Sequence, residues 1–446
     1  GLRAEGTAEN EGTSERIDGE NWQRRETAEN QRRSNSPHKW VIPVAKTCNN
    51  EGWVSPTNRS LKVISANVQS LFNKLDDLRN VVDEIKPDVM AFTETWLTAK
   101  ITDSEISLRG YQHFRRDRPS RGGGVIVYVT RKLTAMADIH IPLRDVEVLS
   151  ITISAKYSRP LTISVVYRSP YQTSDQDLIL ITELYKASEK KAVLIVGDFN
   201  APDIDWKTWT APGMPDNFNH KLLQWATDKL LSQYVTFGTR TREGQQSNCL
   251  DLIFTRDEEN VLDIQDRPPL GSSDHITLCF EYSLFSKPNL PDTWVRNIWK
   301  GDYSLMRRQL SEISWETELH GETNKDWTTL SSLLKRIVYL NCPLRKTTTT
   351  NRPNWINSNL QASFKKRNRF WRRYRQTGSD AHLREYKQQR NVCKCEATKL
   401  RRKFELNILQ KSLEHPKMLY GYILSTKRIR EMIPALRSAD GKLETD

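Results

Sequence analysis

The chain has 446 residues, a formal net charge of +13 and a mean hydropathy of −0.67. No apolar run approaches the roughly 18 residues of a membrane span, and the N-terminus lacks the pattern of a signal peptide, so we expect no membrane partner. The six cysteines form no C-x-x-C pair and are expected to be reduced thiols of an intracellular protein. Because the first residue is Gly1 and the pattern stops abruptly at Asp446, we expect a fragment of a longer protein or a truncated gene model.

The charge is concentrated in one segment. Residues 361–412 carry sixteen Lys and Arg against four Asp and Glu, a net charge of +12, so the remainder is close to neutral. This asymmetry indicates a catalytic domain followed by a helical segment that binds a polyanion. A solvated helical linker is the structural alternative for the same segment.

In chain order, residues 1–58 hold few apolar side chains, and we expect them to be disordered or a gene-model artefact. From Leu61 onward, apolar runs bounded by turn residues predict buried strands, with Ser158-Arg159-Pro160 forming the turn between two neighbouring antiparallel strands. The expected strands cover 61–67, 88–95, 125–130, 146–154, 161–170, 192–200, 249–254 and 276–284. Helical spacing of apolar residues predicts helices at 75–85, 175–188 and 218–233.

These elements favour an α/β (α+β) four-layer sandwich, in which two packed, mainly antiparallel sheets are flanked by helices. We place this domain at residues 59–286. A linker of short amphipathic helices, including 302–313 and 326–341, follows at 287–358. An all-α basic extension occupies 359–446, with helices at 359–375 and 380–413. The second of these carries an apolar stripe of Leu383, Tyr386, Cys393, Ala397, Leu400 and Phe404 opposite a cationic face.

Two short strings carry the chemistry. Asp198 and Asn200 lie two residues apart at a strand end and so face the same side of the strand. A carboxylate in this place can take a proton from water, and an amide can orient that water. Asp274 and His275 begin the last strand, and the histidine suits a hydrogen bond to charge developing on a phosphate oxygen. Asp251, inside an apolar run, is the natural orienting partner of His275. An ordinary Asp-Asn turn and a surface histidine are the structural alternatives.

Other strand ends add groups of the same kind. Glu94 suits a divalent-cation ligand, and Asn67 could support the cation or the phosphate. Tyr167 and Arg168 offer a phenol and a guanidinium to phosphate, whereas Arg115 fits a structural ion pair with Asp117 as well as it fits a site. In the basic extension, aromatic residues including Trp371 interleave with cations, which suits stacking on bases beside phosphate contacts.

Several motifs occur together in a fixed order. They are SANVQSLFNKLDDL, TETWL, RRDRPSRGGGVIVYV, VVYRSP, IVGDFNAPDIDW, SNCLDLIFT and PPLGSSDH. The chain thereby resembles the endonuclease/exonuclease/phosphatase superfamily, which is deoxyribonuclease I-like, and most of all the apurinic-endonuclease-like domain of non-LTR (LINE-type) retrotransposons. PNWINSNLQASFKKRNRFWRRYRQTG, YKQQRNVCKCEATKLRRKFE, HPKMLYGYI and ALRSADGKLETD are similar to the linker that precedes a reverse transcriptase in those elements.

The resemblance implies a role for each matching residue. Asp198, Asn200, His275, Asp251 and Tyr167 fall at catalytic positions, and Asn67, Glu94 and Asp274 at metal positions. The phosphate- or DNA-binding candidates are Arg115, Arg168, Ser247, Ser273, Lys365, Arg369, Trp371 and Arg372. Gln69 replaces an aspartate of the apurinic repair enzymes, which makes abasic-site specificity unexpected.

As a whole, the resemblance predicts a Mg²⁺-dependent endonuclease, with Mn²⁺ as an alternative ion, that nicks double-stranded DNA in the nucleus and leaves a 3′-OH primer. Element RNA is a second partner expected at the basic helices. Two other functions remain open at this point: a phosphodiesterase or phosphatase of the same fold, and a catalytically idle remnant that only binds nucleic acid.

Overall fold

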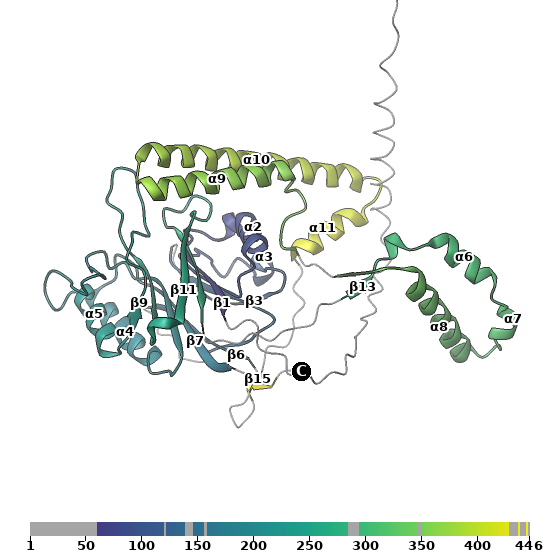
Figure 1. Ribbon diagram of the computed structural model, residues 1–446, viewed down its shortest axis with the longest axis horizontal. Coiled ribbons are helices and arrows are strands. Elements are labelled where there is room, and N and C mark those ends of the chain that lie inside the picture. The colour runs from purple at the N-terminus through teal and green to yellow at the C-terminus, as the bar shows by residue number, and fades with distance from the viewer. Residues whose placement is uncertain are drawn as a thin grey trace, which may run out of the picture. The chain divides into compact units, whose positions relative to one another are not determined.

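The computed structural model describes residues 60–119, 122–138, 146–155, 158–283, 294–346, 350–427, 436–437 and 443–444 (Figure 1). The segment 1–58, expected to be disordered, lies outside these residues. The described chain forms two compact units, one of residues 60–283 with 350–444 and one of residues 294–346. Among the described helices, none is both long and apolar enough to cross a membrane.

The first sheet of the larger unit has six strands in the order β11-β12-β1-β2-β4-β3. Strands β1 and β2 are parallel, and every other neighbouring pair in this sheet is antiparallel. Edge strands β3 and β11, which the sequence patterns did not predict, are more polar and more exposed than the central strands. The strands cover β1 Leu61–Asn67, β2 Val89–Thr93, β3 Tyr111–Arg116, β4 Val125–Thr130, β11 Val261–Arg267 and β12 Thr277–Tyr282.

The second sheet also has six strands, in the order β5-β6-β7-β8-β10-β9, with β7 and β8 as its parallel pair. The predicted antiparallel pairing of β6 with β7 is confirmed, but the predicted turn residues are not in the turn, because β7 already begins at Ser158. The strands cover β5 Thr134–Ala137, β6 Glu147–Ala155, β7 Ser158–Tyr167, β8 Val193–Asp198, β9 Ser232–Gln233 and β10 Asp251–Thr255.

Helices complete the predicted layers. Apolar residues of α2 (Leu75–Ile85) and α3 (Asp103–Ile106) pack on the outer face of the first sheet. Those of α4 (Ser174–Ala187) and α5 (Phe218–Asp228) pack on the outer face of the second, while the inner faces of both sheets share one core. Helix α5 is shorter than predicted, because Leu230 takes a left-handed conformation and the chain then forms β9. The predicted α/β sandwich is therefore confirmed.

The basic helices α9 (Ser358–Thr377) and α10 (Asp380–Ser412) form an antiparallel hairpin that belongs to the larger unit (Figure 1). Gly378 ends α9 with φ +66°, a left-handed conformation that glycine adopts without strain. Four apolar side chains of the hairpin join the same core cluster as the inner faces of the sheets: Trp371, Tyr374, Leu383 and Tyr386. The hairpin is thus packed on the sandwich rather than separate from it.

Ion pairs surround this apolar contact. Arg375 pairs with Asp266 of β11, Arg401 with Asp76 of α2 at 3.1 Å, and Lys387 with Glu243 at 2.7 Å. Beyond α10, helix α11 (Lys417–Lys427) follows, and two short paired strands, β15 Leu436–Arg437 and β16 Leu443–Glu444, lie near the C-terminus.

The smaller unit is a separate helical element. Strand β13 (Trp294–Arg296) pairs with β14 (Leu344–Lys346), and the chain between them forms α6, α7 and α8. Buried Met306, Ile337 and Cys342 form its core. Helices α6 (Tyr303–Ser311) and α8 (Thr323–Asn341) lie close to the predicted ranges, and α7 covers Trp315–Glu318.

Candidate active site

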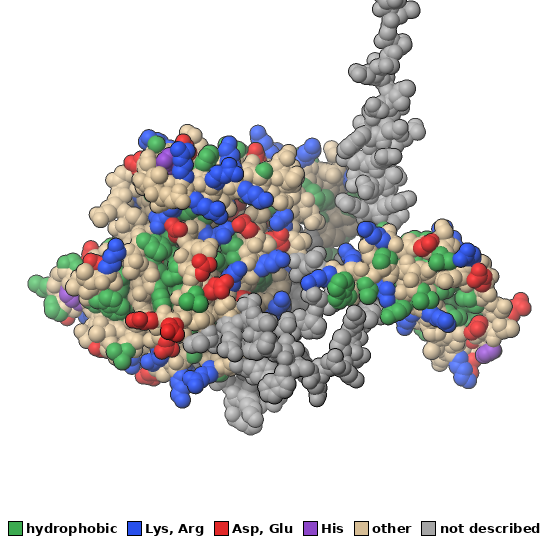
Figure 2. Space-filling view, in the orientation of Figure 1, with side chains coloured by type: hydrophobic (Ala, Val, Ile, Leu, Met, Phe, Trp, Pro, Cys, Tyr) green, Lys and Arg blue, Asp and Glu red, His purple; other side chains and the backbone are tan. Residues whose placement is uncertain are grey.

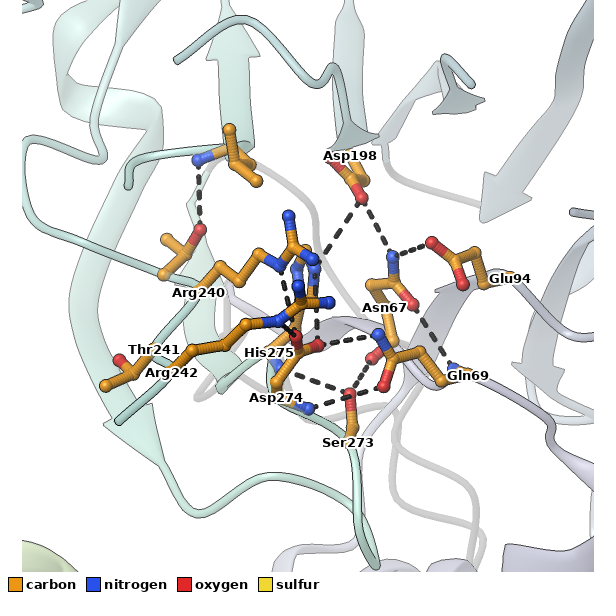
Figure 3. Close-up of polar contacts among 12 residues, drawn as sticks. Asn67, Gln69, Glu94, Asp198, Arg240, Thr241, Arg242, Ser273, Asp274 and His275 are labelled. Atoms are coloured by element: carbon orange, nitrogen blue, oxygen red, sulfur yellow. Dashed lines mark hydrogen bonds and ion pairs between the residues drawn. The ribbon is translucent and has the colours of Figure 1, made fainter. Parts of the chain in front are cut away.

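Sheet register brings the predicted polar residues to one end of the sandwich. In the first sheet, β1 and β2 run parallel and end side by side, so Asn67 pairs with Thr93 and Glu94 follows directly. In the second sheet, Asp198 ends β8 and lies opposite both Asp251, the first residue of β10, and Tyr167, the last residue of β7. Both sheets therefore contribute to a single cluster of polar groups (Figure 3).

Asn67 links two carboxylates from different sheets. Its side-chain amide donates to Asp198 Oδ2 at 2.8 Å and to Glu94 Oε1 at 2.7 Å (Figure 3). Asn67 and Asp198 are both fully buried. Burial raises the pKa of Asp198 to about 7, although the neighbouring His275 opposes this shift. Asp198 is therefore a carboxylate whose affinity for a proton is matched to neutral pH.

His275 lies between carboxylates. Its Nδ1 is 2.8 Å from Asp251 Oδ2, and its Nε2 is 3.9 Å from Asp198 Oδ2 and 3.8 Å from Asp274 Oδ1. Burial lowers the pKa of His275, but Asp251, Asp198 and Asp274 outweigh it and raise the value to about 9. At neutral pH the ring therefore carries a proton on both nitrogens, and Nε2 is a hydrogen-bond donor.

Asp274 is bound by cations that sequence patterns did not identify. Arg242 donates to its Oδ2 at 2.6 Å and Arg240 at 3.1 Å, while Gln69 donates to Oδ1 at 2.6 Å (Figure 3). Partial burial raises the pKa of Asp274, but Arg242, His275 and Arg240 lower it more, so the net shift is downward. Because three donors occupy this carboxylate, it is a weaker metal ligand than the sequence suggested, and its main contacts are with the loops.

Tyr167 lies beside Glu94. Burial, with the carboxylates of Glu94 and Asp198, raises the pKa of the Tyr167 phenol, which also hydrogen-bonds to Glu94. The phenol therefore stays protonated and donates to an acceptor at the site. On the neighbouring strand, Glu147 is paired with Tyr167 and accepts a hydrogen bond from Gly124 N. This hydrogen bond holds the loop that contains Gly123 and Gly124. The carbonyls of these two glycines accept hydrogen bonds from the amides of the two residues after Glu94.

Several predicted residues have contacts other than those expected. The Asn200 side chain donates to Arg168 O at 2.7 Å, and its main-chain N–H donates to Asp198 Oδ1 at 3.1 Å. Arg168 pairs through two nitrogens with Asp177 at 2.7 and 2.8 Å, so its guanidinium is already occupied. Arg115 contacts Asp103 at 3.0 Å and Asp117 at 3.6 Å, as in the ion-pair alternative.

The two serines predicted to bind phosphate or DNA differ in burial. Buried Ser273 donates to Asn67 O at 2.8 Å and thus joins the loop before His275 to the end of β1. Ser247 is exposed and donates to Arg240 O at 3.0 Å, in the loop that carries Arg240 and Arg242. Ser273 is therefore part of the framework of the site, and Ser247 lies in an adjoining loop.

The phosphate- or DNA-binding candidates on α9 lie on two faces of the helix, one exposed and one buried. Lys365, Arg369 and Arg372 are exposed, as expected for phosphate contacts. Trp371 is only 2% exposed, with its ring 4.9 Å from that of Tyr386, so it is not available to stack on a base. Composition could not separate these residues, but helical position does, since Trp371 shares the inward face with buried Phe364 and Tyr374.

Left-handed backbone is concentrated around the site. Four non-glycine residues at three strand ends have positive φ: Gln69 at 41°, Ser70 at 79°, Glu94 at 50° and Asn200 at 45°. Such conformations cost roughly 1–3 kcal/mol each and tend to cluster at functional sites. The cluster therefore marks this end of the sandwich independently of its polar groups.

A comparison of the sequence with protein families agrees with this location. Residues 64–275 match the sequence model of the Endonuclease/Exonuclease/phosphatase family. This segment is therefore similar to that family. The matched segment begins inside β1 and ends at His275, so it includes every residue of the polar cluster described above. No curated protein matches the chain.

The chain is also similar to solved structures whose descriptions name nucleases. The endonuclease domain of TRAS1, a telomere-specific non-LTR retrotransposon, is 16% identical with a TM-score of 0.42, covering 50% of this chain and 99% of that one. The AP endonuclease LMAP from Leishmania major is 18% identical with a TM-score of 0.42, covering 57% and 98%. The 3′-5′ exonuclease NExo from Neisseria meningitidis is 16% identical with a TM-score of 0.40, covering 50% and 100%.

Proposed function

We propose that this domain of the endonuclease/exonuclease/phosphatase family hydrolyses a phosphodiester in double-stranded DNA and leaves a nick with a 3′-OH. The observation that carries the proposal is the hydrogen-bonded and ion-paired row from Asp251 through His275 and Asp198 to Asn67 and Glu94. It places a base, a protonated donor and a further carboxylate within one buried cluster, as phosphodiester hydrolysis requires.

Each group has a stated role in the reaction. Asp198, with its pKa near neutrality, accepts a proton from water, and the water oxygen bonds to phosphorus as the bond to the 3′ oxygen breaks. His275 donates from Nε2 to the phosphate as negative charge develops, while Asp251 accepts from Nδ1 and keeps the ring protonated. The 3′ oxygen takes up a proton from solvent water, which completes the 3′-OH, and Asp198 releases its proton to solvent.

The acidic side of the cluster fits a divalent cation. Glu94 and Asn67 offer hard oxygen atoms of the kind that Mg²⁺ or Mn²⁺ prefers. Glu94 is one of the groups that raise the pKa of Asp198, after burial and Asp251, so two acidic side chains lie close together at this point. When bound, the cation neutralises phosphate charge and stabilises the leaving oxygen.

A second grouping of possible ligands consists of Asp198, Asp251 and His275, whose ligand atoms lie within 4.8 Å of one another. Metal ligation requires a neutral imidazole nitrogen, and the raised pKa of His275 means that a cation binding there would have to displace a proton. Its Nδ1 is also engaged by Asp251 at 2.8 Å. We therefore assign the cation to Glu94 and Asn67, and acid–base chemistry to this group.

Nicking with a 3′-OH product also fits the resemblance to non-LTR retrotransposon endonucleases. In that setting the product primes reverse transcription, the chain between residues 287 and 446 connects to a reverse transcriptase, and the reaction takes place in the nucleus. The ordered motifs of the domain and of its C-terminal extension support this assignment.

We extend the proposed nucleic-acid-binding surface to α9 and α10. Lys365, Arg369 and Arg372 recur at spacings of four and three residues on the exposed face of α9, while Arg375 faces Asp266. Figure 2 shows Lys and Arg side chains across these helices. Exposed cations that follow one face of a helix suit the phosphates of DNA or of element RNA, without reading its sequence.

A plasmid assay tests the proposal. Supercoiled DNA with Mg²⁺ should be converted to open circles that a DNA polymerase extends, and EDTA should stop the conversion. His275→Ala and Asp198→Ala should each lower the rate by about 10²–10³, whereas His320→Ala, an exposed residue of the smaller unit, should not.

Three results would contradict this reading. Equal rates for all three variants would remove the catalytic assignment. Hydrolysis of inositol phosphates or phospholipids in preference to plasmid would favour the phosphatase alternative, and DNA binding without any nicking would favour the idle remnant.

A further inference from the structure

Lys74 is a buried lysine that the proposed reaction does not use. It lies where a short 3₁₀ turn, Phe72–Lys74, leads into α2, and its residue is only 7% exposed. Its Nζ donates to the carbonyls of Val68 and Gln69, the latter at 2.8 Å. Because a buried ammonium is unfavourable without partners, these two hydrogen bonds define where Lys74 is held.

Both carbonyls belong to the turn that follows β1. Gln69 and Ser70 of this turn have left-handed backbone, with φ of 41° and 79°, which a chain without glycine adopts only when its surroundings enforce it. The turn also determines two contacts of the candidate active site. The Gln69 amide N–H donates to Asn67 Oδ1 at 3.2 Å, and the Gln69 side chain donates to Asp274 Oδ1 at 2.6 Å.

The stem of Lys74 reaches a second loop. An added Cβ at Gly271 would lie 2.9 Å from Lys74 Cγ, so this glycine leaves the space that the stem occupies. Gly271 precedes Ser273 and Asp274, and Ser273 in turn donates to Asn67 O at 2.8 Å. Lys74 therefore contacts two loops that carry site residues.

We propose that Lys74 is a positioning residue, whose ammonium holds the turn after Asn67 so that Asn67 and Gln69 stay aligned with Glu94 and Asp274. The inference rests on the proposed hydrolysis, because its consequence for the rate exists only if the domain cuts DNA. Its structural consequence, a rigid turn between residues 67 and 70, is independent of activity.

Lys74→Met tests this role, because methionine keeps the apolar stem and removes the three donors. We expect kcat for plasmid nicking to fall about 10- to 100-fold, as for other residues that orient a metal or catalytic group, with KM nearly unchanged. Amide exchange at Val68 and Ser70, which donate to Thr93 O and Glu94 O, should accelerate, while amides of β8 keep their protection. Lys86→Met, at the exposed end of the same helix, is the matched control and should keep the wild-type kcat.

Two further variants separate positioning from stability. Lys74→Gln retains a single short donor and should give an intermediate kcat, which also covers the case in which the methionine variant fails to fold. In a Gln69→Ala background, Lys74→Met should have a smaller effect than in the wild type, because both act through the same turn.

The outcomes are distinct. If the wild type does not nick plasmid, the proposed function fails, while the exchange measurement still tests the turn. If the wild type nicks and Lys74→Met has the same kcat, the positioning role is overturned. A lower unfolding temperature with unchanged kcat and unchanged exchange at Val68 and Ser70 would also overturn it.

Discussion

Trp371 and Arg372 are adjacent on α9, but the first is buried and the second is exposed, and this difference gives a sharp test of what the hairpin does. Trp371 is 2% exposed and packs its ring 5.5 Å from Tyr374 and 4.9 Å from Tyr386, in the core cluster shared with the sheets. Arg372 is exposed. Alanine at the first position should therefore act on stability, and alanine at the second on nucleic-acid binding.

The size of each effect follows from burial and charge. Truncation of a buried Trp to Ala costs about 3–5 kcal/mol. Because Trp371 Nε1 has no hydrogen-bond partner among the described residues, no bond is lost, and we expect a value near 3 kcal/mol. At roughly 2–4 °C per kcal/mol, Trp371→Ala should lower the unfolding temperature by about 6–12 °C. Arg372→Ala should leave it within about 1–2 °C.

DNA binding should respond in the opposite order. Losing one phosphate contact removes about 0.9 from the slope of log K against log salt, so Arg372→Ala should reduce that slope by close to one unit. Trp371→Ala should not change the slope at temperatures where the domain stays folded. The assays are thermal unfolding by circular dichroism and DNA binding at four or five salt concentrations.

One pattern of results would refute the packing argument. If Trp371→Ala kept the wild-type unfolding temperature and weakened DNA binding at all salt concentrations, the tryptophan would be a stacking platform, as the sequence suggested. By the same reasoning, deletion of residues 361–446 should destabilise the nuclease-like domain. Because residues 361–412 carry most of the net positive charge, the same deletion should also weaken DNA binding.

Three further predictions concern the candidate active site. The value of kcat/KM should rise with pH until Asp198 is ionised, with a midpoint at or below about 7, and fall as His275 loses its proton near 9, which a pH profile will show. Asp251→Asn should be milder than His275→Ala and should move the alkaline limb to lower pH, because it removes a charge that raises the pKa of His275; an unmoved limb would contradict this. Glu94→Gln should raise the Mg²⁺ concentration for half-maximal nicking by at least about 10-fold, and an unchanged requirement would place the cation elsewhere.

Sequence patterns predicted the parts of the fold that rest on continuous apolar runs. Central strands such as β4 and β8 are buried along their whole length, so hydrophobicity alone marks them. Edge strands β3 and β11 have mixed, half-exposed faces and short apolar stretches, and no pattern singled them out. The residue types of Ser158–Pro160 suit a turn as well as a strand, so the sequence alone could not assign them to β7. Their place in that strand follows from its pairing with β6.

The candidate site was predictable to the extent that its residues end strands. Asp251 in an apolar run required a partner, and the structure brings it to His275. Contacts made by loops could not be predicted from the sequence. Arg240 and Arg242 donate to Asp274 from a polar segment in which apolar residues do not recur at a helical or strand spacing. Arg168 pairs with Asp177 at the start of α4, an interaction between a loop and a helix terminus that spacing does not specify.

The distribution of strain explains why these loops matter to the site. Glu94 and Asn200 follow buried strands and adopt left-handed backbone directly at the polar cluster, which is unfavourable by itself. Glu94 O accepts the amide of Ser70, the carbonyls of Gly124 and Gly123 accept the amides of the two residues after Glu94, and Arg168 O accepts the Asn200 side chain. The chain at and beside each strained residue is therefore held by hydrogen bonds. The rigid sandwich thus stabilises a geometry that the loops alone would not keep. A group aligned before DNA arrives needs no reordering in the transition state, which is the condition under which electrostatic catalysis is most effective.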